Sequence, residues 1–209
     1  MIEALGAGPV EMFASSGGAV TALALIAACP GDVTTLVAHE PPLIPVLPDA
    51  RAAERARAGV RDAYEDRGWG AGMAAFIRMT SWEGEFTGDY FAQPAPDPAT
   101  FGIPAEDDGS RDDPLLSDRS WAVSDYRPDA EALAATPTRV VIAVGEETGD
   151  AFTARTAVAT AELLGQTATV FPSNHGGFLD GEFGHAGQPE AFAHKLREIL
   201  DAAARRSSS

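Results

Sequence analysis

Short apolar runs and helical patterns alternate at the N-terminal end of the chain. Residues 8–14 form an apolar run that stops at Ser15-Ser16-Gly17-Gly18, and residues 19–28 after it are apolar nearly all round, as in a helix covered on most sides. Residues 32–39 form a second apolar run rich in β-branched side chains. This order predicts a strand, a helix and a parallel strand joined by a right-handed crossover.

The same alternation returns at the C-terminal end. Residues 139–145 are typical of a buried strand, 150–165 of a helix, 168–171 of a strand and 189–205 of a closing amphipathic helix. Strands that alternate with helices along the chain favour a parallel sheet with helices on its faces. We therefore predict an α/β fold with a mostly parallel sheet flanked by helices.

The middle of the chain has a different pattern. A proline-rich segment, 41–48, leads to a charged amphipathic helix over residues 49–66 with Asp49 as its N-cap, and a second helix over 70–80. Residues 93–114 are rich in proline and acidic side chains and predict an irregular loop. The prediction is a first core part at residues 1–44, a helical cap inserted at 45–135 and a second core part at 136–209.

Composition narrows the classes of function. The formal net charge of −16 over 209 residues argues against nucleic acid and membrane surfaces as partners. One cysteine allows neither an internal disulfide nor a Cys-based zinc site, and the four histidines show no ligand spacing with carboxylates, so we expect no metal or organic cofactor. The apolar runs are too short for a membrane span and the N-terminus lacks secretory-signal features, which predicts a cytoplasmic protein. The expected partner is a small-molecule substrate, because nucleic acid and membrane surfaces are disfavoured.

The strongest local signal is the pentapeptide Ala14-Ser15-Ser16-Gly17-Gly18 between a strand and a helix. Small residues around a serine at this junction are typical of a nucleophile elbow, with the serine hydroxyl at the tip and the next backbone N–H free to stabilise an oxyanion. This assigns Ser16 as the nucleophile and Gly17 as the oxyanion donor. The alternative is a turn that only allows close helix–strand packing.

Three further segments follow predicted strands: His39-Glu40-Pro41-Pro42, Gly145-Glu146-Glu147 and His175-Gly176-Gly177-Phe178. With the Ser16 pentapeptide they give the chain order nucleophile, acid, histidine. Together these motifs resemble those of the α/β-hydrolase fold family, over most of residues 1–47 and 127–204. The resemblance implies a serine hydrolase with a cap domain.

The resemblance also implies a role for single residues. Ser16 would be the nucleophile, His175 the general base and Glu147 the acid that orients the imidazole. Alternative acids are Asp150, Glu146 and Asp125. His39 is expected to have a structural role at the mouth of the cap, whereas His185 and His194 are expected to face solvent.

Members of this family carry several strands before the elbow, but only 15 residues precede Ser16 here. We therefore expect an N-terminally truncated core that lacks the loop with the second oxyanion donor and exposes a sheet edge, through which a homo-oligomer could form. Two functions compete: a serine hydrolase acting on a small neutral ester through an acyl-enzyme, active if the missing part is supplied, and a catalytically impaired fragment that serves as a structural or interaction domain. Perhydrolysis by the same triad is a variant of the first function that the sequence does not separate from ester hydrolysis.

Overall fold

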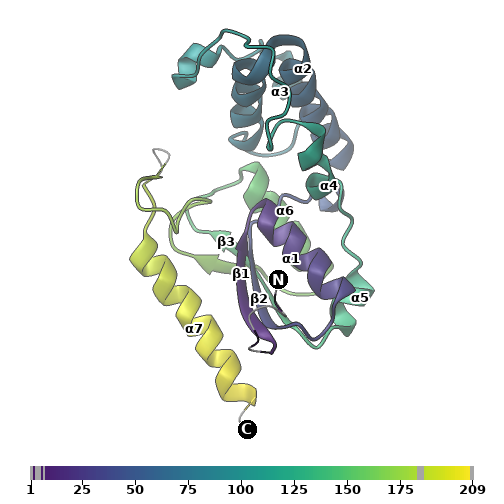
Figure 1. Cartoon of the computed structure of the whole chain (residues 1–209), viewed down its shortest axis with the longest axis vertical. Coiled ribbons are helices and arrows are strands. Elements are labelled where there is room, and N and C mark those ends of the chain that lie inside the picture. The colour runs from purple at the N-terminus through teal and green to yellow at the C-terminus, as the bar shows by residue number, and fades with distance from the viewer. Residues whose placement is uncertain (1, 3–5, 7, 183–185, 208–209) are drawn as a thin grey trace.

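A four-stranded parallel sheet lies at the centre of the structure, a computed structural model that describes residues 2, 6, 8–182 and 186–207 (Figure 1). Its strands are β1 (Val10–Ser15), β2 (Val33–His39), β3 (Arg139–Gly145) and β4 (Thr169–Phe171), and they lie in the order β1-β2-β3-β4. The prediction of an α/β fold with a parallel sheet is confirmed, with β3 at the predicted residues and the bounds of β1, β2 and β4 shifted by at most two residues.

Helices cover both faces of the sheet, because successive side chains along each strand point to opposite faces. Leu36 and Ala38 of β2 pack against the face with α1 (Gly17–Ala28) and α6 (Phe152–Leu163). Val37, between them, packs on the opposite side with α7 (Pro189–Ser207). Figure 1 shows α7 across the sheet from α1 and α6. Both faces of β2 are therefore buried, as its nearly continuous apolar sequence indicates.

The inserted segment forms a separate layer of helices on one side of this core (Figure 1). Its main elements are α2 (Ala50–Thr80), α3 (Gly88–Ala92), α4 (Trp121–Ser124) and α5 (Ala130–Ala135), with 3₁₀ turns at Ile44–Val46, Pro98–Phe101 and Asp118–Ser120. The two predicted helices at 49–66 and 70–80 are joined across Gly68, whose φ of 83° breaks the helical path. The end of the segment belongs to the core, because Leu133 of α5 packs with α1 and α6.

An ion pair fastens the cap to the core. Arg155 of α6 contacts the carboxylate of Asp49 and donates a hydrogen bond of 2.7 Å to the carbonyl of Gly84. Asp49 occupies the predicted N-cap position of α2, but its carboxylate accepts from the Phe86 backbone N–H at 2.8 Å instead of capping the helix. Burial raises the pKa of Asp49, but the hydrogen bonds from Arg155 and Phe86 outweigh it and leave this pKa below its usual range.

No helix in the described ranges combines the length and the apolar character needed to cross a membrane.

Replacement of Arg155 by Met is expected to lower the free energy of unfolding by about 3 kcal/mol, because it leaves the Asp49 carboxylate charged and mostly buried. Urea unfolding at pH 7 measures this loss. The matched control is Lys195→Met, since Lys195 lies 3.8 Å from Glu198 in an exposed pair that contributes about 0–1 kcal/mol. Equal losses in the two variants would contradict a fastening role for Arg155.

Candidate functional site

Ser16 stands at a strained turn between β1 and α1. Its φ of 54° and ψ of −132° lie in a region that residues with a side chain rarely adopt. The backbone N–H of Ser16 donates to the His39 carbonyl at 2.9 Å, which fixes the turn to the end of β2. Since α1 begins at Gly17, the Gly17 N–H is one of the amides that have no acceptor within the helix.

Two more residues with side chains have positive φ in the described part of the chain: Glu40, at 45°, and Ser173, at 69°. They follow β2 and β4, so all three strained residues lie where a strand of the sheet ends. Carboxyl ends of parallel strands share one edge, where ligands bind in open α/β sheets. Strain gathered at that edge marks a candidate functional site.

Glu40 is the centre of a hydrogen-bond network at this edge. Its side chain is fully buried. Oε1 accepts from the Gly145 N–H at 2.8 Å and from Thr148 Oγ1 at 2.6 Å. Oε2 accepts from Thr153 Oγ1 at 2.7 Å and lies 2.6 Å from Nδ1 of His175. Each oxygen of the carboxylate therefore has two partners.

This network keeps Glu40 ionised. Burial raises the pKa of the carboxyl group, but the hydrogen bonds from His175 and Thr148, together with the charge of His175, lower this pKa to about 2. A carboxylate beside Nδ1 holds the imidazole in the tautomer whose Nδ1 carries the proton. Nε2 of His175 is then free to accept a proton, and with 39% of its side chain exposed the ring is open to a small molecule.

Glu147, the acid assigned from the sequence, does not pair with His175 in this structure. Its Oε1 accepts from Gln188 Nε2 at 2.9 Å, and its Oε2 lies 3.3 Å from Ser173 Oγ. The carboxylate that pairs with His175 is Glu40. The physical reason is position, since Glu40 directly follows β2, whose last residue is bonded to Ser16, whereas Glu147 follows β3 by two residues and its carboxylate contacts Gln188 and Ser173.

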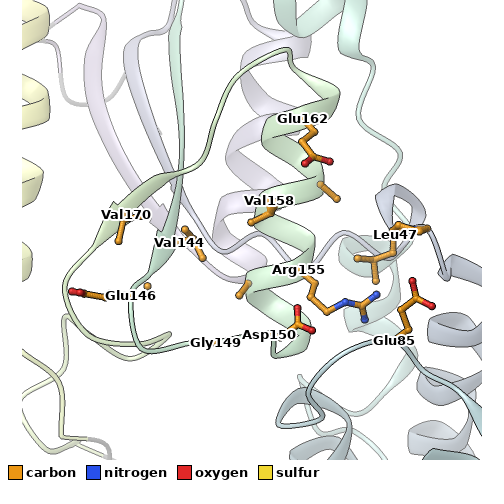
Figure 2. Close-up of a pocket in the computed structure, with 14 residues that line it drawn as sticks. Leu47, Glu85, Val144, Glu146, Gly149, Asp150, Arg155, Val158, Glu162 and Val170 are labelled. Atoms are coloured by element: carbon orange, nitrogen blue, oxygen red, sulfur yellow. The ribbon is translucent and has the colours of Figure 1, made fainter.

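The alternative acids also lie elsewhere. Asp125 forms an ion pair with Arg57 at 2.7 Å in the cap. Asp150 and Glu146 line a cavity of about 600 Å³ beside α6, shown in Figure 2. The residues that line this cavity include apolar side chains, four acidic side chains and Arg155, but neither Ser16 nor His175.

Ser16 and His175 are brought to the same edge of the sheet through His39. The His39 carbonyl holds Ser16, and the His39 ring stacks on that of His175 with the ring centroids 6.0 Å apart. No hydrogen bond joins the Ser16 hydroxyl to His175 among the described contacts. Such bonds are often long without substrate.

Helix α4 covers the start of α1. A Cβ atom built on Gly17 would lie 3.3 Å from Cγ1 of Val123. A residue of the inserted segment therefore lies close to Gly17, the predicted oxyanion donor.

The remaining histidines differ in their surroundings. His39, expected at the mouth of the cap, is fully buried in the core, and Nδ1 of its ring lies 3.0 Å from Ser15 Oγ. Burial lowers the pKa of His39 to about 4, with a smaller opposing effect from Glu40. His194 has 78% of its side chain exposed, as predicted, and His185 lies outside the described residues.

Neither a metal-binding cluster among the described residues nor a known relative identifies the site. Among the described residues, no group of three or more His, Cys, Asp or Glu side chains could hold a metal ion. No protein-family model matches the chain, and no curated protein matches it.

Sequence reasoning missed Glu40, Thr148 and Thr153 as parts of the site. Glu40 carried one usable signal, since it follows a buried strand directly and stands next to a histidine. The two threonines carried none, because Thr148 lies in an ordinary loop after β3, Thr153 lies in the first turn of α6, and their partner is 108 and 113 residues away along the chain.

The low pKa of His39 predicts acid sensitivity. The pKa of the His39 imidazole is 6.5 in the unfolded chain and about 4 in the folded protein. The free energy of unfolding is therefore fully present above pH 6.5 and falls as the pH drops through this window, because the unfolded chain binds the proton first. Between pH 7 and pH 5 the His39 contribution to the free energy of unfolding is expected to fall by about 2 kcal/mol. Urea unfolding at both pH values measures the change.

The matched variants are His39→Gln, which removes this titration, and His194→Gln, which removes an exposed histidine. His39→Gln should lose less stability than the wild type between the two pH values, and His194→Gln should keep the wild-type dependence. The same slope in His39→Gln and the wild type would contradict the assignment.

Proposed function

We propose that the protein is a serine hydrolase of the α/β-hydrolase type that acts on a small neutral ester or related acyl compound. Ser16 is the nucleophile, His175 the general base and Glu40 the orienting acid. The observation that carries the proposal is the contact of 2.6 Å between the buried Glu40 carboxylate and His175 Nδ1, at the edge where the strained Ser16 turn lies.

The reaction follows from this arrangement. His175 Nε2 takes the proton of the Ser16 hydroxyl as its oxygen attacks the ester carbonyl, and the Gly17 N–H stabilises the negative oxygen of the tetrahedral intermediate. The intermediate collapses, and the alcohol leaves with the proton from His175. Water then attacks the acyl-enzyme, again giving its proton to His175, and the acid product leaves as Ser16 regains its hydrogen.

Glu40 supports the positive charge that His175 carries in each transition state. A fixed carboxylate beside Nδ1 stabilises the imidazolium, and burial strengthens this interaction. The net charge of −16 disfavours polyanionic substrates, which supports a neutral acyl compound.

A second candidate function is an interaction domain with impaired catalysis, and one observation favours it. β1 lies at the end of the strand order and pairs only with β2 among the described strands. An open strand edge can add a strand from another chain. Reactivity of Ser16 distinguishes the two functions.

A fluorophosphonate probe tests the nucleophile. We expect one probe molecule to be bound per chain, with the modified residue identified as Ser16 by mass spectrometry of peptides. Ser16→Ala should not be labelled, and Ser15→Ala should still be labelled at Ser16 when the reaction is followed to completion. Labelling that persists in Ser16→Ala, or no labelling of the wild type, would refute the proposal.

Paired substitutions of the two acids test the orienting carboxylate. Glu40→Gln is expected to lower kcat/KM for 4-nitrophenyl acetate by roughly 10,000-fold, because the amide has no charge to stabilise the imidazolium and favours the wrong tautomer of His175. Glu147→Gln should keep wild-type kcat/KM. The opposite pattern would restore Glu147 as the acid.

A further inference from the structure

His39 is a buried histidine that the proposed mechanism does not use. Its side chain is fully buried, and no hydrogen-bond partner lies within reach of Nε2 among the described residues. A phenylalanine would fill an aromatic environment without a buried, unpaired nitrogen. The choice of histidine therefore calls for a role beyond packing. The surrounding rings are those of Phe13, Phe171, Phe178, Phe192 and His175.

The His39 ring lies beside the His175 ring and nearly parallel to it. The two imidazoles are stacked, with an angle of 24° between their planes and 6.0 Å between their centroids. Glu40 holds the Nδ1 edge of His175, and His39 restrains its plane. One contact fixes the edge and the other fixes the plane, so together they set the direction of Nε2.

The same residue also holds the nucleophile. The His39 carbonyl accepts from the Ser16 N–H at 2.9 Å, and Nδ1 of the ring lies 3.0 Å from the hydroxyl of Ser15, the neighbour of Ser16. His39 thus contacts both sides of the proposed nucleophile–base pair. The Ser15 hydroxyl is the only hydrogen-bond partner of the His39 ring among the described residues, so it sets the orientation of that ring.

We propose that the half-buried Ser15 and the buried His39 form a positioning pair that fixes the His175 imidazole relative to Ser16. This role rests on the proposed function. The pair touches no reacting atom and acts only through the direction of His175 Nε2.

The surroundings of His39 keep this pair uncharged at neutral pH. Burial lowers the pKa of His39 to about 4, and His175 lowers it further against the effect of Glu40. Glu40 and His175 are the titratable groups named against the ring, and the neighbours from β1, β4 and α7 are Ser15 and phenylalanines. A neutral ring can lie against the protonated form of His175 without repelling it.

The test compares Ser15→Ala, Ser15→Thr and His39→Gln in the full chain. Steady-state hydrolysis of 4-nitrophenyl acetate and the rate constant of fluorophosphonate labelling are measured for each. We expect Ser15→Ala and His39→Gln to lower kcat and the labelling rate by about 10-fold to 100-fold, because misplacement of a catalytic group by about 1 Å costs up to this much. KM should stay near the wild-type value. Ser15→Thr, which keeps the hydroxyl, should recover most of the loss.

His194→Gln serves as the matched control, since that ring is exposed and its partner is Glu198, which takes no part in this network. Wild-type kcat and labelling rate in a folded Ser15→Ala variant, or a failure of Ser15→Thr to recover activity, would overturn the positioning role. Failure of the proposed function is a different result, in which the wild type itself is not labelled at Ser16.

Discussion

The arrangement of the site depends on the burial of one negative charge, that of Glu40. A carboxylate without solvent contact is unfavourable unless donors surround it, and Glu40 takes its donors from Gly145, Thr148, Thr153 and His175. These donors come from the end of β3, the loop after it, the start of α6 and the loop after β4. The segments that donate hydrogen bonds to the Glu40 carboxylate also form this edge of the sheet. The packing of these segments and the placement of His175, the proposed base, therefore depend on each other.

Backbone strain at the same edge is balanced by hydrogen bonds between neighbouring strand ends. Ser16, Glu40 and Ser173 have positive φ, at an expected cost of about 1–3 kcal/mol each. The Ser16 N–H bonds to the His39 carbonyl, the Glu40 N–H to the Ala143 carbonyl at 3.0 Å, and the Ser173 carbonyl accepts from the Glu147 N–H at 2.8 Å. Ser16 and Glu40 are thus tied to the end of the neighbouring strand, and Ser173 to the loop after β3, and the buried sheet below supplies the rigidity that keeps their side chains at the edge.

The sequence predicts what depends on local pattern and misses what depends on distant partners. Apolar runs between helical patterns located β1, β2, β3 and β4, because burial on both faces leaves a nearly continuous apolar sequence. The strained geometry at Ser16 also agrees with the small residues around it. The partner of His175 was beyond this reasoning, since 135 residues separate it from Glu40 and several carboxylates follow strands in an acidic chain. The stacking of His39 on His175 likewise arises only because the loop after β4 brings His175 to the end of β2.

The first turn of α6 connects the cap to this edge. Thr153 donates to Glu40, and Arg155, two residues later and therefore on another face of the helix, holds Asp49 and the Gly84 carbonyl. Both residues lie in the first turn of one helix, so the same turn supplies a donor to the buried charge and the contact that joins the cap to the core. Attachment of the cap and compensation of the Glu40 charge therefore depend on the same short stretch of backbone.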